Sequence, residues 1–472
     1  MIRIAAICLI ICLAINVGFS QKEDSEEKIG AQTFQMVKET MGIYKDEKLL
    51  KEVEAIGRSM EKYLGMTRPL NYYLVDAAEP NAFATAGGYV YVTRGLLAII
   101  NTPDELAGIM AHELSHVVLK HSTKRMKAGI VPSILQMPAR VVATLASPEV
   151  AGILNIPVGF ASKAALAAYS RGQEKAADEH GVGIAIQAGY KPYGLVDGLE
   201  RLTKYVEFIV GKEMEKDIFT DHPMTEKRVA NLTEILEKKG FKRAPYYEGT
   251  DMRSIEGLVY GQNPEEGLID STRVIHPAIG LYFEFPKGWS AQNSPSSLVL
   301  LAPDKQSAMI TSVDTTSAAP ADAAKVIVDK MKEGGLKIIS EESYERNGLQ
   351  GYRAIVGDNT RTAELRWMKL PGGILLKVVG ITGTDKPNTA VTTSMDSYRP
   401  STDADLSTFR FHTVELKENL PDKPVASFVE GGDAKGNRAK LLEILNGVQP
   451  GKGITNGKYV KVIRTTPLLA KR

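Results

Sequence analysis

The pentapeptide His112-Glu113-Leu114-Ser115-His116 constrains this chain more than any other feature. Apolar residues recur around it at helical spacing, Thr102-Pro103 supplies an N-cap threonine with proline at the first helical position, and Gly129 offers a stop. Two histidines four residues apart lie on one face of a helix, so both imidazoles can reach one metal ion. Glu113 leans over the same edge, where a carboxylate can accept a proton from a bound water. The pattern predicts a zinc hydrolase site, and the alternative is a structural helix with two solvated histidines.

Zinc needs a third protein ligand, and a second helical segment offers one. His121 follows His112 by nine residues, which places it on the opposite side of a continuous helix, so we expect it to contact a ligand from behind or to lie at the surface. Glu174 and Asp178, in the run from Ser170 to Asp178, are four residues apart and share a face. Glu174 could complete the metal site while Asp178 accepts the outer N–H of a ligating histidine. A solvated acidic helix face would show the same spacing.

The two motifs together resemble the M48 metallopeptidases. The segment from Asn81 to Leu97 is similar to the strand and turn that precede the active helix of that family, although Thr85-Ala86 replaces the Leu-Pro often found there. His222-Pro223, followed by Arg228, is similar to its downstream His-Pro element. Four such elements occur in the family's order.

The resemblance implies a gluzincin, which is a His-Glu-x-x-His zinc peptidase with a glutamate as third ligand. His112, His116 and Glu174 are the implied zinc ligands. Glu113 is the implied general base, and Asp178 holds a ligand from outside. The resemblance further implies that His222 and Arg228 lie near the site, as helpers for the developing oxyanion or as switch groups.

Substrate contacts are expected on a strand before the active helix. Apolar and aromatic residues predominate from Tyr89 to Val92, which predicts a strand. If this strand lies at the edge of a sheet, an extended substrate can pair with it through main-chain hydrogen bonds. Asn81, Tyr89 and Tyr91 are then the residues that we expect to contact substrate.

The first 20 residues have the features of a signal peptide. A basic start at Met1 to Arg3 precedes an apolar run from Ile4 to Phe19, and Gly18-Phe19-Ser20 forms a small-x-small cleavage site. Cys8 and Cys12 both lie in this segment, so the mature chain would carry neither disulfides nor a cysteine-ligated metal. We expect export to a bacterial periplasm, with secretion or a retained membrane anchor as the second choice.

The remaining sequence predicts an α+β protein built from three parts. A mainly helical metallopeptidase domain covers residues 21–264, an α+β accessory domain with a helix from about Pro320 to Lys332 covers 265–400, and a C-terminal segment covers 401–472. Leu442 to Gly447 and Gly457 to Ile463 resemble the second half of a LysM module, so peptidoglycan is a possible ligand of this segment. With everything after Pro264 removed, an enzyme should still cleave unfolded protein, whereas a scaffold would lose its partner binding.

The composition limits the classes of molecule that this chain can be expected to bind. A formal net charge of +2, without a long basic tract, argues against nucleic acid as a partner. Charges are sparse between Gly129 and Ser170, a stretch that could form a lid over the metal cleft, a peripheral membrane contact or a buried helical pair. Two functions fit. One is an exported zinc endopeptidase that cleaves misfolded or envelope-associated proteins. The other is a metal-retaining chaperone or scaffold that docks to a cell-envelope complex and cleaves little.

Overall fold

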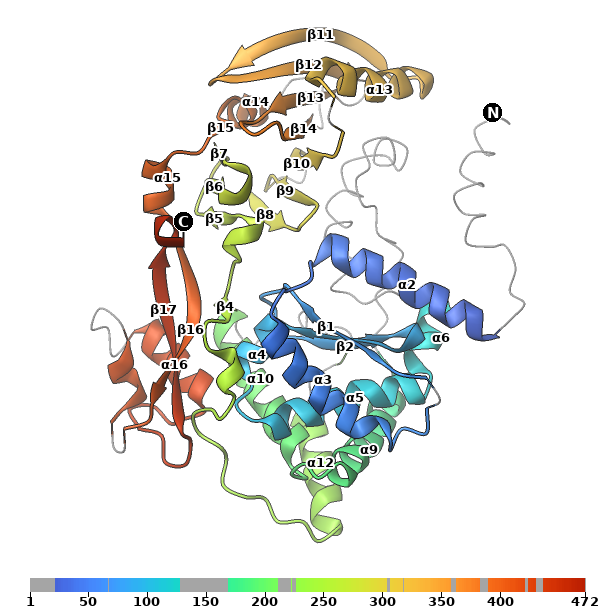
Figure 1. The fold of residues 1–472 in the computed structure, drawn as a ribbon, viewed down its shortest axis with the longest axis vertical. Helices are drawn as coiled ribbons and strands as arrows, with labels where there is room; N and C mark the ends of the chain where they lie inside the picture. The colour runs from blue at the N-terminus through green and yellow to red at the C-terminus, as the bar shows by residue number, and fades with distance from the viewer. Residues whose placement is uncertain are drawn as a thin grey trace.

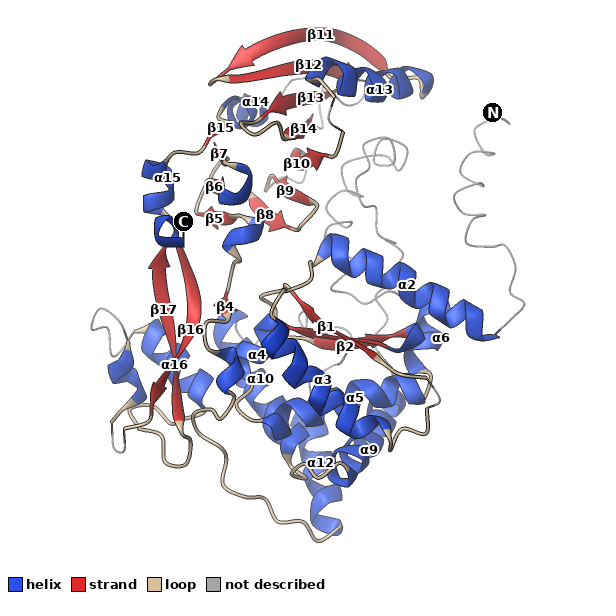
Figure 2. Cartoon of the chain, in the orientation of Figure 1, coloured by secondary structure: helices blue, strands red, loops and turns tan. Residues whose placement is uncertain are grey.

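The computed structural model combines helices and sheets in one α+β chain (Figure 1, Figure 2). It describes residues 22–66, 68–127, 169–210, 222, 226–303, 306–316, 318–357, 362–382, 389–420, 423–429 and 436–471. The expected signal peptide therefore lies outside the described residues, and so does the sparsely charged stretch up to residue 168. In the part that is described, no helix has both the length and the apolar character that crossing a membrane requires.

The peptidase part places a small sheet between two layers of helices. In chain order its elements are α2 (Lys22–Thr40), α3 (Glu47–Glu61), β1 (Asn71–Val75), β2 (Ala82–Thr85), β3 (Tyr89–Thr93), α4 (Arg94–Ile99), α5 (Pro103–Val118), α6 (His121–Lys127), α9 (Arg171–Gln187), α10 (Gly194–Val210) and α12 (Glu226–Lys238). The strand order is β1-β3-β2, with β1 parallel and β2 antiparallel to β3. One face of this sheet packs against α2 and the other packs against α3 and α5.

The strand from Tyr89 to Thr93 was predicted correctly, but its predicted place at the sheet edge was wrong. β3 is the central strand, hydrogen-bonded on both sides, so a substrate cannot add to it. Side chains alternate along the strand. Tyr91 therefore lies in the cluster beneath α2, with Tyr89 packed against that cluster, while Val90 and Val92 face α5.

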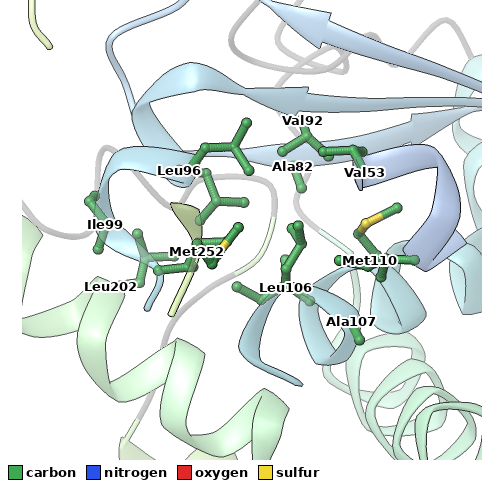
Figure 3. Close-up of a cluster of buried hydrophobic side chains, with 14 of the residues drawn as sticks. Val53, Ala82, Val92, Leu96, Ile99, Leu106, Ala107, Met110, Leu202 and Met252 are labelled. Carbon is green, nitrogen blue, oxygen red and sulfur yellow. The ribbon is translucent and has the colours of Figure 1, made fainter. Parts of the chain in front are cut away.

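Helix α5 is the buried centre of the peptidase part. Thr102 caps it by accepting a hydrogen bond from the Glu105 N–H at 3.2 Å, and Pro103 begins it, as predicted. Every residue from Glu105 to His116 is buried, which is expected of a helix that is apolar on nearly all sides. Figure 3 shows its inner face, Leu106, Ala107 and Met110 among them, against the sheet and neighbouring helices.

The end of α5 differs from the prediction of a helix that runs on to Gly129. The helix ends at Val118, and Lys120 adopts the left-handed region with φ of 57° before α6 begins at His121. The chain therefore turns at this point. The turn brings His121 beneath the metal motif, where a continuous helix would have carried it to the opposite side.

The accessory domain is built from two antiparallel sheets. The larger sheet has the order β11-β12-β13-β14-β10-β9-β8, the smaller one has the order β15-β7-β6-β5, and α13 packs on the larger sheet. The bounds are β5 (Leu268–Asp270), β6 (Arg273–His276), β7 (Leu281–Glu284), β8 (Ser290–Asn293), β9 (Ser297–Leu301), β10 (Ala308–Asp314), α13 (Pro320–Glu333), β11 (Lys337–Arg346), β12 (Leu349–Gly357), β13 (Thr362–Lys369), β14 (Leu375–Thr382), α14 (Thr389–Asp396) and β15 (Arg399–Pro400). The predicted helix from about Pro320 is thus confirmed.

The C-terminal segment is part of the peptidase core. It contains α15 (Asp403–Thr408), β16 (Arg410–Glu418), α16 (Asn437–Asn446) and β17 (Tyr459–Pro467), and β16 pairs with both β17 and β4 (Val259–Tyr260). Leu445 and Val462 belong to the same hydrophobic cluster as the inner face of α5. The expectation that everything after Pro264 can be removed without loss is therefore wrong, because such a truncation would open this core.

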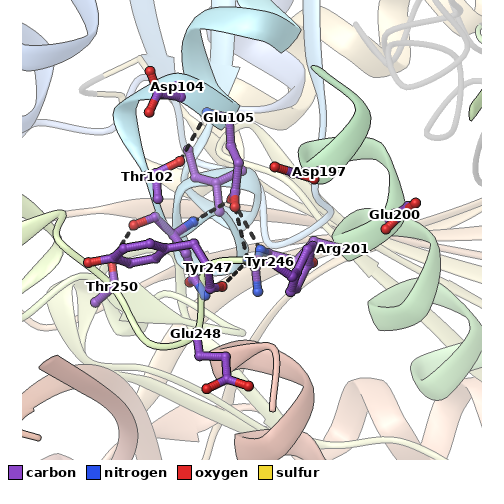
Figure 4. Close-up of polar contacts among 12 residues, drawn as sticks. Thr102, Asp104, Glu105, Asp197, Glu200, Arg201, Tyr246, Tyr247, Glu248 and Thr250 are labelled. Atoms are coloured by element: carbon purple, nitrogen blue, oxygen red, sulfur yellow. Dashed lines mark hydrogen bonds and ion pairs between the residues drawn. The ribbon is translucent and has the colours of Figure 1, made fainter. Parts of the chain in front are cut away.

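A buried polar network ties the turn before α5 to Arg201 of α10 and to residues 247–250 (Figure 4), and Lys461 extends it to the C-terminal segment. Arg201 donates to both carboxylate oxygens of Glu105, at 3.1 and 2.9 Å. The Thr250 hydroxyl donates to the Asn101 carbonyl at 2.9 Å. Lys461 Nζ, fully buried, donates to the carbonyls of residues 98, 99 and 100 at 2.8, 2.7 and 3.2 Å. Four successive carbonyls ahead of the metal helix are thus satisfied by residues far along the chain.

Candidate metal centre

Four side chains direct their donor atoms to one point between α5 and α9. They are His112, His116, Glu174 and His222, and one ligand atom from each lies within 4.8 Å of all the others. The Nε2 atoms of His112 and His116 are 3.1 Å apart, and Glu174 Oε1 lies 3.4 Å from His116 Nε2. His222 Nδ1 lies 3.0 Å from Glu174 Oε1 and 3.3 Å from His112 Nε2. The three predicted ligands are thus brought together, with a histidine as a fourth donor.

The outer nitrogens of the two motif histidines are held from behind. Asp178 Oδ1 lies 2.9 Å from His112 Nδ1, the position predicted for it. His121 Nδ1 lies 3.1 Å from His116 Nδ1. When Nδ1 of each ring carries the proton, the Nε2 lone pair is free for a metal.

Arg228 links the two buried acidic residues of α9, Glu174 and Asp178. Its Nε and Nη2 donate to the two oxygens of Asp178 at 3.0 and 2.7 Å, and its Nη1 forms an ion pair with Glu174 Oε2 at 2.9 Å. Burial alone would raise the pKa of Glu174, but the positive charge of His222 and hydrogen bonds from His116 and His222 hold it below its usual range. The carboxylate therefore stays ionised, which is the form that binds a metal.

The two remaining polar groups respond to burial in opposite ways. Burial raises the pKa of Glu113, whose Oε1 lies 3.5 Å from His222 Nε2. Burial would lower the pKa of His222, but the charges of Glu113 and Glu174 raise it to about 9. A carboxylate with a raised pKa next to a protonatable imidazole is suited to proton transfer.

The residues fit a bound cation. Two Nε2 atoms that face each other at 3.1 Å, with both outer nitrogens held, leave lone pairs directed at the same space. Burial lowers the pKa of His116 to about 2, so this imidazole is neutral and can act as a ligand. Two imidazoles and a carboxylate form the donor set of catalytic zinc sites.

Tyr169 is a residue of the site that the sequence motifs did not single out. Its ring stacks on the His116 ring at a centroid distance of 3.9 Å and an angle of 24°. Its hydroxyl lies 3.0 Å from Ser122 Oγ, and the Arg125 guanidinium lies over its other side. The signal was its position immediately before Ser170, at the start of the second motif.

The three residues expected to contact substrate do not approach the four donors. Tyr91 is completely buried beneath α2, where its ring stacks on Phe83, and Tyr89 stacks on Tyr73. The Asn81 N–H donates to the Thr93 hydroxyl at 2.9 Å, which fixes the start of β2. The side chains of Tyr89 and Tyr91 pack on the face of the sheet away from α5.

Comparison with known proteins finds relatives that are named as proteases. The model of the family described as peptidase family M48 matches residues 47–236. The chain is 30% identical over 176 residues to metalloprotease LoiP of Escherichia coli strain K12, covering 37% of this chain and 66% of that protein. It is 23% identical over 232 residues to the beta-barrel assembly-enhancing protease of Yersinia pestis, covering 46% and 45% of the two chains. It is 30% identical over 225 residues to a protease HtpX homolog of Thermococcus sibiricus, covering 40% and 75%.

The fold and the donor cluster define a metallopeptidase domain, with its motif on a buried helix and an acidic pair on a second helix. The chain belongs to the peptidase M48 family, which confirms the resemblance seen in its motifs. It spans 66% of the first of these relatives and less than half of the second.

Proposed function

We propose that this chain is a zinc-dependent endopeptidase with Glu113 as its general base. The observation that carries the proposal is the position of Glu113. Its buried carboxylate lies on the same helix as two of the four donors and 3.5 Å from His222 Nε2. A structural metal site has no use for a buried carboxylate beside the metal.

His112, His116 and Glu174 would hold the zinc. When bound, zinc lowers the pKa of its water toward neutrality and polarises a substrate carbonyl. Glu113 takes the proton of the attacking water and returns it to the leaving amine. Its raised pKa favours both steps, since a more basic carboxylate accepts the proton of the water more readily and can then pass it on to the amine.

The residues around the metal ligands orient the ligand side chains and donate hydrogen bonds. Asp178 and His121 fix the rings of His112 and His116, and Arg228 holds Asp178 with two hydrogen bonds. The charges of Glu113 and Glu174 raise the pKa of His222 to about 9 in the absence of a metal, and an N–H of its imidazole can donate a hydrogen bond to a developing oxyanion.

The substrates that we propose are unfolded or envelope-associated proteins. The relatives named as metalloproteases and as a beta-barrel assembly-enhancing protease support a protein substrate. Export to the periplasm is proposed from residues 1–20 alone. For the C-terminal segment we favour a structural role over glycan binding, because its apolar side chains lie in the peptidase core.

The scaffold reading also has one observation in its favour. Four protein donors can fill all four positions of a tetrahedral zinc site, and closed sites of this kind are typically structural. If His222 occupies the fourth position, His222→Ala should raise cleavage by opening it. If His222 serves the reaction as a donor, the same variant should lower cleavage while the metal stays bound.

The test combines metal analysis with cleavage of unfolded casein. Wild type should bind about one zinc per chain, as a single site of this donor set requires. Glu174→Ala should lose metal and cleavage, whereas Glu113→Gln should keep metal and lose cleavage. Glu179→Ala is the matched control, since Glu179 lies on the same helix but is exposed. Zinc-dependent cleavage by Glu113→Gln would remove Glu113 from this role.

A further inference from the structure

A cavity of about 590 Å³ lies between the peptidase part and the accessory domain. Residues 76–79 and Arg94 line it from the peptidase side, and residues 261–263 and Glu266 line it from the connection between the two parts. All four residues of β8 line the third side. This volume is within the range of ligand sites in proteins, and β8 lies at the end of the accessory domain that is nearest α2 (Figure 1).

Strand β8 presents open main-chain groups to this cavity. It is the last strand of its sheet and pairs only with β9. Ser294 and Ser297 exchange both main-chain hydrogen bonds at the hairpin end, and the ladder alternates from there. Gln292 and Ser290 therefore bond to β9, while the N–H and C=O groups of Ala291 and Asn293 point away from it. Neither residue has another main-chain partner among the described residues.

The two edges of the same sheet are protected to different degrees. The opposite edge, β11, carries Glu341, Glu342 and Glu345 among its exposed residues, and such charges prevent an edge from pairing with another chain. The sequence of β8, Ser-Ala-Gln-Asn, has no charged residue and no proline. An unguarded edge is therefore found only on the side that faces the cavity.

The cavity also carries negative charge. Its only cation among the described lining residues is Arg94, which forms an ion pair with Asp76 and donates to the Val259 carbonyl at 3.0 Å. Glu79 and Glu266 are two further carboxylates of the lining. Burial, and then the charges of Asp76 and Glu265, raises the pKa of Glu266, and the charge of Lys45 offsets only part of this rise.

We propose that this cavity binds an extended polypeptide segment that carries a lysine or arginine, by strand addition to β8. The main-chain groups of Ala291 and Asn293 pair with the segment, and Glu79 and Glu266 attract its basic side chain. Residues 76–79 lead into β2, which begins three residues after Glu79, at most about 11 Å along the chain, and packs on α5. A segment in the cavity is therefore held next to the strand that covers the metal helix. The proposal rests on the endopeptidase function, since it supplies a second contact for a protein substrate.

The experiment uses the full chain with Glu113→Gln, so that binding is measured without cleavage. The probe is a short labelled peptide of alternating threonine and valine with a central lysine, and its binding is followed by fluorescence anisotropy. Ala291→Pro removes an outward N–H and leaves the ladder to β9 intact. It should weaken binding about tenfold, the effect expected for one main-chain hydrogen bond. Ala291→Val, which keeps the N–H, is the matched control.

A charge substitution gives a second test of the proposal that does not rely on a proline variant. Glu266→Gln should weaken binding of the lysine peptide and should not weaken binding of the counterpart with a central glutamate, because the substitution removes a negative charge. Unchanged binding in Ala291→Pro, or equal binding of the two peptides to the parent chain, would overturn the proposal. Binding retained in a chain that cleaves nothing with Glu113 restored would instead count against the endopeptidase function and leave the cavity site standing.

Discussion

Lys461→Met tests whether the C-terminal segment holds the metal helix in place. The lysine ammonium is fully buried and donates to three successive carbonyls at the end of α4, immediately before α5. Methionine has a similar volume but no donor. The variant therefore leaves three buried acceptors without their partner and leaves the apolar packing almost unchanged.

The expected loss follows from the contacts. Hydrogen bonds to a charged group contribute about 1.5–3 kcal/mol each, and the desolvation of the buried ammonium offsets part of their sum. Burial lowers the pKa of Lys461, because desolvation disfavours its charged form. We expect the free energy of unfolding to fall by about 3–5 kcal/mol, as for the loss of one partner of a buried polar pair.

The assay exploits the position of the two tryptophans. Trp289 and Trp367, the only two in the chain, both lie in the accessory domain, so tryptophan fluorescence in urea reports that domain. Far-UV circular dichroism follows the helices of the peptidase part as well. Lys461→Met should lower the midpoint by circular dichroism and leave the fluorescence midpoint in place. Lys458→Met, at an exposed position nearby, should change neither. Equal stability of the two variants would refute the reasoning.

Three further predictions concern the metal and an ion pair outside it. Arg228→Met should weaken zinc binding about 10–100-fold, measured by competition with a chelator, because two carboxylates of the site lose their common partner. Removal of metal with EDTA should lower the circular-dichroism midpoint and spare the fluorescence midpoint, since the ligands belong to the peptidase part alone. Asp405→Asn should cost about 1 kcal/mol or less at neutral pH. Hydrogen bonds from Arg399 hold the pKa of Asp405 below its usual range, so this stabilisation is present above about pH 4 and is lost as the pH falls through the lowered pKa. The urea midpoints of the variant and the wild type should therefore differ at neutral pH and converge in acid. A difference that stays constant with pH would contradict the assignment.

Local patterns were sufficient for the parts of the site that one helix carries. The four-residue spacing of His112 and His116, and of Glu174 and Asp178, fixed each pair on one face. Thr102 and Pro103 marked the start of α5 because capping depends on neighbouring residues only. The structure contains these features as predicted because the interactions that determine them lie within a few turns of one helix.

Features that depend on distant segments could not be predicted in the same way. Whether a strand such as Tyr89 to Thr93 is central or at an edge depends on which other strands pair with it. Here β1 pairs with one side of it and β2 with the other, so the strand is central. The turn at Lys120, which brings His121 under His116, has no glycine or proline to announce it. Nothing in the sequence near Lys461 indicates that its ammonium is buried against α4.

The sequence by itself indicated the chemistry that we propose for this protein, because a metal-binding pair and a neighbouring carboxylate need only helical periodicity and the right residue types. The tertiary structure decided which further groups reach that pair and which segments form one folding unit. It placed His222 as a fourth donor, joined the C-terminal strand to the peptidase core and left the edge of β8 open on a cavity. Contacts between residues hundreds of positions apart are set by the packing of whole elements, and no local pattern records them.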